Sequence, residues 1–208
     1  MNIFDNINSK SQEKILKLLE ANTHIFKKDN SILSMIKNDN ILCILVEGNI
    51  QIIKTDYNGN ITIIEELEKN SIFGSMISNI SNNEYQIVTK TDCKILLIEY
   101  DRIINENNNT PAYSQFIRNL LKIISIKISE KNDRIEILTE KTIRNKLLKY
   151  FQILSKKTGS KNIYLPFSFT ELANYLSVDR SALMREIKNL KDDNIISSNN
   201  RHIKINII

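Results

Sequence analysis

The sequence predicts an α+β protein in three successive parts: an antiparallel β-roll, one long helix, and a small helical domain that ends in a β-hairpin. Short apolar blocks alternate with turn signals over residues 41–99, which is typical of strands in an antiparallel roll. Neither Pro nor Gly occurs between Ala112 and Thr158, and the first half of this stretch has a helical apolar period. Helix-start signals and an alternating hairpin follow near the carboxyl end. We therefore expect domains at 1–112, 113–138 and 139–208.

The first part combines a short helix with a series of strands. Residues 9–20 have the apolar spacing of an amphipathic helix. Gly48 marks one turn between strands, and Asn58-Gly59 marks another. Because Asn and Gly both tolerate a positive φ, Asn58-Gly59 predicts a two-residue hairpin loop. The expected strands are 41–46, 50–54, 61–64, 85–91 and 94–99.

The long helix carries a seven-residue apolar repeat. Apolar residues recur at alternating spacings of four and three, with one polar break at Lys131. Such a seam is typical of helices that pair with a second helix, so we expect a dimer. A long core helix without a partner chain is the alternative. Ile123 and Ile126 lie off the seam, and we expect them to pack on the roll. The predicted dimer interface consists of Ile117, Leu121, Ile124, Ile128, Ile135 and Leu138.

The third part predicts two short helices joined by a tight turn, after a helix over 140–156 and a strand over 162–166. Ser168 and Glu171 have the spacing of a capping box, which starts the first of the two helices. Asp179 is a suitable N-cap for the second, over 180–190. Ala173 is small enough to let the two helices approach closely, as in a helix-turn-helix.

The second of these helices has one apolar and one polar face. Leu183, Ile187 and Leu190 share the face that we expect to be buried. In a helix-turn-helix the opposite face enters the major groove of DNA, where the planar fork of arginine pairs with guanine O6 and N7. Ser177 stands in the turn where Gly is frequent, a conformation that serine adopts at modest cost. The expected DNA contacts from these helices are Thr170, Arg180, Ser181, Met184, Arg185 and Lys188.

A β-hairpin is predicted after the second helix. Asn199-Asn200 supplies a turn, and residues 201–207 alternate cleanly between polar and apolar side chains. A hairpin in this place is a wing, and Arg201 and His202 near its tip are expected to touch phosphate. The alternative is a small helical subdomain that binds protein.

Charge and composition narrow the function classes. Residues 139–208 contain 13 Lys and Arg against 6 Asp and Glu, a net charge of +7, whereas residues 1–138 carry −2. This asymmetry favours a polyanion-binding carboxyl domain. Two cysteines, Cys43 and Cys93, are too few for a disulfide framework or a metal cluster. With His24 as the only histidine outside the wing, a metal-dependent enzyme in the roll is disfavoured, and we expect neither catalytic nor metal-binding residues. Without a signal peptide or an apolar run of membrane length, we expect a cytoplasmic protein.

The chain resembles the catabolite-activator/FNR (Crp/Fnr) family of bacterial transcription regulators over nearly its whole length. The resemblance implies a cyclic-nucleotide-binding-like roll that acts as an effector sensor, a long dimerisation helix and a DNA-binding winged helix. Arg180 and Arg185 would read bases. Many members have Glu where Ser181 stands, so the operator should differ from theirs. The residues that carry the resemblance are Val46-Glu47-Gly48-Asn49-Ile50, Asn58-Gly59, Phe73-Gly74, Lys90-Thr91-Asp92-Cys93 before Ile98, and Asp179 through Ile187.

The resemblance also places an effector pocket in the roll, and this chain departs from the pattern of cyclic-AMP binders. Those members carry Phe-Gly-Glu where this chain has Ser75 in the Glu position, and an Arg-Ser pair where Asn83 and Glu84 stand. A carboxylate in place of that Arg would repel a cyclic phosphate. The polar pair that meets adenine becomes Ile128-Ser129. The candidate pocket residues are Phe73, Gly74, Ser75, Met76, Asn83, Glu84, Tyr85, Ile128 and Ser129.

The sequence thus predicts a homodimeric, sequence-specific transcription regulator that is not an enzyme. Its expected partners are double-stranded DNA, a second copy of itself and RNA polymerase, with no membrane. We expect its effector to be an unknown small molecule other than cyclic AMP, or no effector at all, and we identify no cofactor. The alternative function is a small-molecule- or protein-binding module whose winged helix is a protein-interaction surface.

Overall fold

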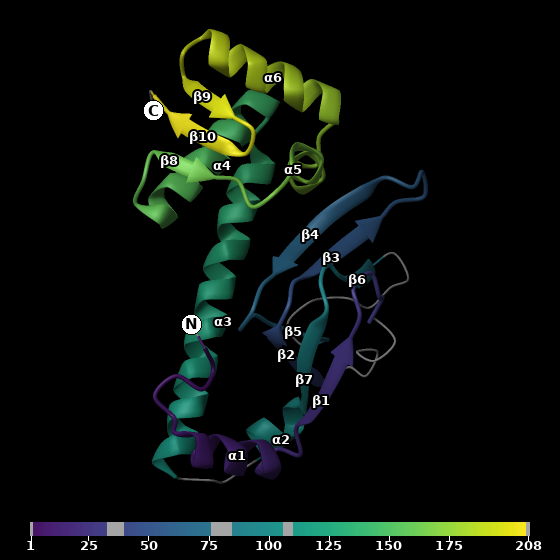
Figure 1. Cartoon of the computed structure of the whole chain (residues 1–208), viewed down its shortest axis with the longest axis vertical. Coiled ribbons are helices and arrows are strands. Elements are labelled where there is room, and N and C mark those ends of the chain that lie inside the picture. Colours follow the sequence, from purple (N-terminus) through teal and green to yellow (C-terminus); the bar gives the residue numbers. More distant parts are fainter. Residues whose placement is uncertain (1, 33–39, 76–84, 106–109, 207–208) are drawn as a thin grey trace. The chain divides into compact units, whose positions relative to one another are not determined.

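The computed structural model describes residues 2–32, 40–75, 85–105 and 110–206, and the α+β class is confirmed (Figure 1). The chain divides into two compact units, Met1–Lys127 and Ile128–Ile208. The boundary falls inside α3 (Pro111–Thr139), so this one helix belongs to both units. Among the described residues, no helix has the length and apolar character that crossing a membrane would require.

The first unit is an antiparallel roll of two sheets. One sheet has the strand order β1-β7-β2-β5 and the other has the order β4-β3-β6. Side chains from both sheets, Leu45, Ile52, Phe73, Ile87 and Ile95 among them, form the core between them. The strands are β1 (Asn22–Phe26), β2 (Ile41–Glu47), β3 (Ile50–Thr55), β4 (Ile61–Leu67), β5 (Ile72–Phe73), β6 (Tyr85–Thr89) and β7 (Cys93–Glu99).

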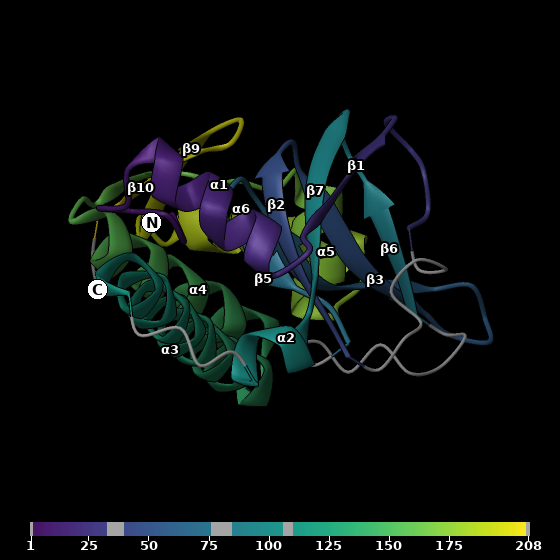
Figure 2. The same cartoon turned by 90° about the horizontal axis from the view of Figure 1, so that it is seen from below.

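Helices cover the outer face of the first sheet. Leu42 and Leu96 of that sheet pack with Ile15 of α1 (Ser9–Leu18) and with Phe116 and Leu120 of α3. Figures 1 and 2 show α1 and the first half of α3 beside β2 and β7. A further short helix, α2 (Tyr100–Ile104), follows β7 directly.

The Asn58-Gly59 prediction of a two-residue hairpin loop is wrong. The β3–β4 connection is the five-residue segment 56–60, and of the two residues only Gly59 has a positive φ, of 81°. The Asp56 carboxylate organises the loop, because it accepts hydrogen bonds from the backbone N–H groups of Asn58 and Asn60, each at 2.8 Å. The Asn60 side-chain amide also donates to this carboxylate at 2.8 Å, and that bond, together with the backbone bonds, holds the pKa of Asp56 below its usual value. Asp56 thus supplies the hydrogen-bond acceptor of a loop that is longer than Asn58-Gly59 alone predicts.

The second unit consists of the last turns of α3 and a winged helix. It contains α4 (Ile143–Thr158), α5 (Phe169–Leu176) and α6 (Arg180–Asp192). Its strands β8 (Asn162–Tyr164), β9 (Ile196–Asn199) and β10 (His202–Ile205) form one sheet in the order β8-β10-β9. The predicted hairpin is thus present, and β8 extends it to three strands.

Candidate DNA interface and dimer face

The helix-turn-helix is built by local hydrogen bonds that the sequence encodes. Ser168 caps α5: its hydroxyl accepts from the Glu171 N–H at 3.3 Å, and the Glu171 carboxylate accepts from the Ser168 N–H at 2.9 Å. The predicted capping box is therefore confirmed. Asp179 accepts from the Ala182 N–H at 2.8 Å and caps α6. Ala173 is 1% exposed, as a close contact between α5 and α6 requires.

The turn between the two helices has a left-handed residue. Ser177 has φ 53° and ψ 53°, the conformation that glycine adopts most easily. Its neighbour Val178 donates its N–H to the Ala173 carbonyl at 3.0 Å, which closes the end of α5. The serine therefore makes the turn in place of the glycine that is frequent there.

The two faces of α6 separate as the pattern predicts. Leu183, Ile187 and Leu190 are buried in the unit's core. The polar face points to solvent, and it presents two arginines and one lysine. Arg144 of α4 holds α6 from the side by ion pairs to Glu186 at 3.2 Å and to Asp193 at 2.6 Å. The exposed residues of α6 in the predicted contact set are Arg180, Ser181, Met184, Arg185 and Lys188, and Thr170 on α5 is exposed as well.

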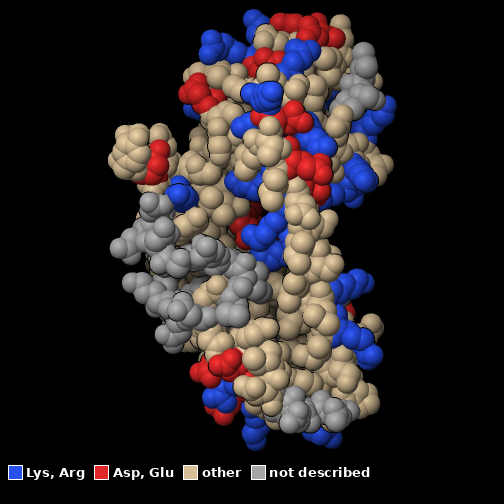
Figure 3. Space-filling view, turned by 180° about the vertical axis from the view of Figure 1, so that it is seen from behind, with Lys and Arg blue, Asp and Glu red and all other residues tan. Residues whose placement is uncertain are grey.

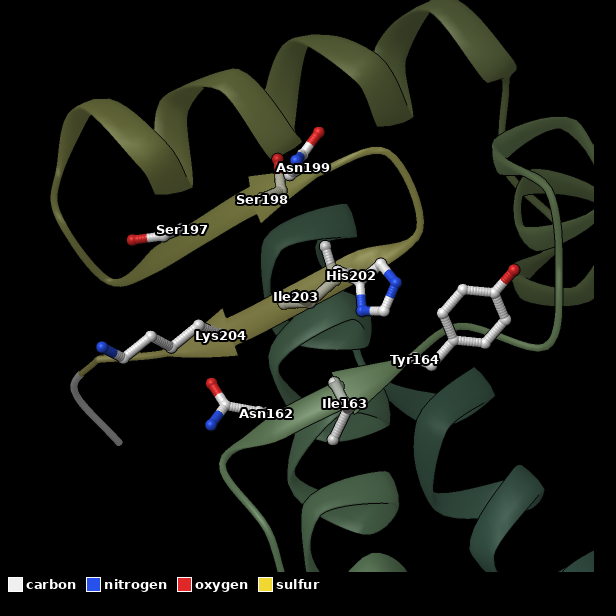
Figure 4. A pocket seen from close by; sticks show the side chains of 9 residues that line it. All are labelled: Asn162, Ile163, Tyr164, Ser197, Ser198, Asn199, His202, Ile203 and Lys204. Carbon is white, nitrogen blue, oxygen red and sulfur yellow. The ribbon is translucent and has the colours of Figure 1, made fainter.

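The wing residues are placed differently from the α6 residues. Arg201 turns back onto β8, where its guanidinium lies 4.6 Å from the centre of the Tyr164 ring and donates to the Tyr164 hydroxyl. His202 meets the same ring edge-on, with the ring centroids 4.8 Å apart. Tyr164, His202 and Lys204 are among the residues that line a hollow of about 550 Å³ on the sheet, and Figure 4 shows their side chains. Arg201 and His202 thus form a cluster with Tyr164, and their contact with phosphate stays a prediction.

Charge is mixed on the surface seen from behind in Figure 3, where Lys and Arg side chains stand among Asp and Glu side chains. The basic surplus of the carboxyl part does not form a single-sign area on that face. The observation that favours DNA reading is the residue pattern on α6.

Three of the six predicted seam residues of α3 are exposed, and two others, Ile117 and Ile124, pack in part against the core of the first unit. Leu121, Ile128 and Ile135 are 60%, 55% and 59% exposed in the single chain. Ile117, Ile124 and Leu138 are half-buried. Large aliphatic side chains in a row at this exposure are the expected mark of a surface that a partner covers.

The opposite side of α3 packs on the roll, with one departure from expectation. Ile123 is buried there as predicted, but the prediction for Ile126 is wrong, because this side chain is 44% exposed. The roll-facing position is taken by Lys127 instead. Its ammonium group pairs with Glu65 of β4 and donates to the Ile72 carbonyl at 2.7 Å. Sequence reasoning missed this buried ion pair, although a lysine that interrupts an apolar stripe was a usable signal.

The candidate effector pocket is described in part. Phe73 is fully buried, and Gly74 has φ +123° with the Ile41 carbonyl oxygen 2.1 Å from where a Cβ would lie, so only glycine fits. The Ser75 hydroxyl accepts from the Ile41 N–H at 3.0 Å. Tyr85 begins β6, and Ile128 and Ser129 are exposed on α3. Met76, Asn83 and Glu84 lie outside the described residues.

Comparison with known proteins gives the same two-part division. Residues 16–106 match the family model of the cyclic nucleotide-binding domain, and residues 145–207 match that of the Crp-like helix-turn-helix domain. A protein of Porphyra purpurea, provisionally named as an HTH-type transcriptional regulator (ycf28), is 29% identical, with 94% of this chain and 90% of that protein covered.

Solved structures with a similar fold cover nearly the whole chain. A CooA mutant from Carboxydothermus hydrogenoformans superposes with a TM-score of 0.74 at 18% identity, covering 99% of this chain and 91% of CooA. A cyclic nucleotide-binding domain containing protein from Listeria monocytogenes EGD-e has a TM-score of 0.70 at 13% identity, covering 94% and 97%. At these identities the likeness concerns the fold.

Proposed function

The chain belongs to the Crp/Fnr family of transcription regulators, and we propose that it acts as a homodimer that reads an inverted-repeat operator through α6. Its helix-turn-helix is a DNA-binding domain. The observation that carries the proposal is the outward face of α6. Arg180 and Arg185 are five positions apart there, both are exposed, and the buried face holds the helix in the unit's core. Two arginines so placed can reach one stretch of major groove.

We infer the dimer from the exposed aliphatic residues of the α3 seam. A two-fold axis along that seam would place two α6 helices symmetrically, and an inverted repeat is the DNA sequence that matches such symmetry. Bound at a promoter, such a dimer would meet RNA polymerase. A winged helix that serves as a protein-interaction surface is the competing function.

A gel-shift assay at two salt concentrations tests the proposal against this alternative. We expect the purified protein to shift duplex DNA, and the affinity to fall as the salt concentration rises, because phosphate contacts release counterions. We also expect a selected operator to be retained at the higher salt concentration when a scrambled duplex of equal length is released. Failure to shift any duplex at the lower salt concentration would support the protein-interaction surface.

We expect no binding of cyclic AMP at physiological concentrations. Ser75 occupies the position of the ribose-binding Glu in cyclic-AMP binders, and its hydroxyl already bonds to the Ile41 backbone of β2. Glu84 stands in the sequence where those members carry an Arg, and its charge opposes that of a phosphate. Isothermal titration calorimetry of the purified protein with cyclic AMP should give no measurable heat of binding. Micromolar affinity would contradict this expectation, and an effector of another kind, or none, is what we propose.

A further inference from the structure

Within the second unit, ion pairs join the last turns of α3 to α4. Lys149 pairs with Glu136 at 2.7 Å, and Lys157 pairs with Asp133 at 3.2 Å. These side chains are 30–58% exposed. Exposed pairs of this kind contribute little to stability and loosen further in salt. They hold α3 beside α4, but they do not by themselves fix its direction.

Arg134 makes a different kind of contact, with α5. Its guanidinium carbon lies 4.3 Å from the centre of the Tyr175 ring, and one of its nitrogens donates to the Tyr175 carbonyl at 3.2 Å. The Tyr175 ring itself is packed, with Phe167 at 4.8 Å and Tyr150 at 5.7 Å between ring centroids. A half-buried guanidinium that both stacks and donates is held more firmly than an exposed lysine.

The contact lies at the turn of the helix-turn-helix. Tyr175 and Leu176 are the last two residues of α5, and the Leu176 carbonyl accepts from Lys146 of α4 at 3.2 Å. Two cations therefore bind the carbonyls at the carboxyl end of α5, where positive charge interacts favourably with the helix dipole. The turn that they hold leads directly into α6, so their position sets where α6 begins.

Arg134 is next in sequence to Ile135, an exposed residue of the predicted dimer seam. In the proposed dimer, one short stretch of α3 would therefore face the partner through Ile135 and contact the helix-turn-helix through Arg134. We infer that Arg134 is a positioning residue that fixes the separation of the two α6 helices in the dimer, and thereby selects the half-site spacing of the operator. The inference rests on the dimeric function proposed above.

The experiment compares operators that share identical half-sites and differ in spacing by one base pair in either direction. One base pair moves a half-site by about 3.4 Å and rotates it by about 35° about the DNA axis. We expect the wild-type protein to prefer one spacing by about tenfold or more, a loss comparable to that of a mismatched base pair. Arg134→Met should reduce this preference to within about threefold, while the affinity for an isolated half-site and the salt dependence stay unchanged.

Matched variants separate positioning from other effects. Lys122→Met removes the same charge from an exposed position of α3 and should keep the wild-type preference. Arg134→Lys keeps a cation that can donate to the Tyr175 carbonyl but loses the planar stack on its ring, so we expect a preference between those of the wild-type protein and Arg134→Met. Thermal unfolding shows whether each variant is folded, and Arg134→Gln, which keeps a donor without charge, replaces Arg134→Met if the latter does not fold.

Two results would overturn this inference while leaving the proposed dimeric function intact. The first is an unchanged spacing preference in folded Arg134→Met or Arg134→Gln. The second is a shallower salt dependence in these variants, because it would mean that Arg134 touches DNA phosphate directly. A wild-type protein that binds an inverted repeat no better than a single half-site would instead contradict the dimeric function, and the inference with it.

Discussion

Replacing Leu121 and Ile128 together with aspartate is expected to give monomers. Both side chains are more than half exposed in the single chain, so the substitutions cost the isolated subunit little. In a dimer across the α3 seam, each aspartate would be an unpaired charge inside an apolar interface. An uncompensated buried charge costs about 3–5 kcal/mol, and a symmetric dimer would contain four of them. Sedimentation equilibrium should therefore report the mass of one chain.

Ile126→Asp is the matched control for this experiment. Ile126 lies on the same helix, is 44% exposed and falls outside the seam, so this variant should remain dimeric. A dimer that persists in the double variant would place the interface elsewhere on the chain. Monomers from Ile126→Asp as well would mean that the helix surface as a whole, and not the seam, holds the subunits together.

Replacing Arg185 with alanine is expected to weaken operator binding strongly and selectively. A bidentate arginine–guanine contact contributes about 1–3 kcal/mol of discrimination in each half-site. Because a dimer reads two half-sites, the total loss is about 2–6 kcal/mol when the two contributions add. We expect the ratio of operator affinity to scrambled-DNA affinity to fall accordingly, with relaxed preference at one base pair per half-site. Fluorescence anisotropy with both duplexes measures this ratio.

Lys188→Ala provides the contrast on the same face of α6. Lys188 is exposed one turn further along the helix, where we expect it to meet phosphate. Its loss should weaken operator and scrambled DNA about equally and reduce the salt dependence. If Arg180→Ala and Arg185→Ala both leave the operator-to-scrambled ratio intact, α6 is not the reading helix.

Local signals in the sequence predicted the winged helix well. Ser168, Glu171 and Asp179 determine their helix starts through bonds to backbone groups three residues away, so no distant contact is needed. The burial of Leu183 and Ile187 likewise follows from the helical period alone. The long helix α3 could be located in the same way, since its apolar repeat continues through a stretch without Pro or Gly, and its role as a dimer seam stays a prediction.

Elements that depend on distant partners could not be predicted. Strand β5 is only two residues long and exists because Ile72 and Phe73 pair with β2. Strand β1 has an irregular pattern of burial and is defined by its pairing with β7. The Lys127–Glu65 ion pair joins residues 62 positions apart, and no short-range pattern contains it. The contact of Arg134 with Tyr175 spans 41 positions and was missed for the same reason.

Sequence-specific reading by α6 can be tested by selecting binding sites from a library of randomised duplexes with the purified protein. We expect sequencing of the bound fraction to yield an inverted repeat, with two half-sites separated by about one helical turn or a small multiple of it. We also expect the Arg185→Ala protein to enrich a repeat with a relaxed base pair in each half-site. Enrichment of no common sequence by the wild-type protein, at a salt concentration where it still binds DNA, would contradict sequence-specific reading by α6.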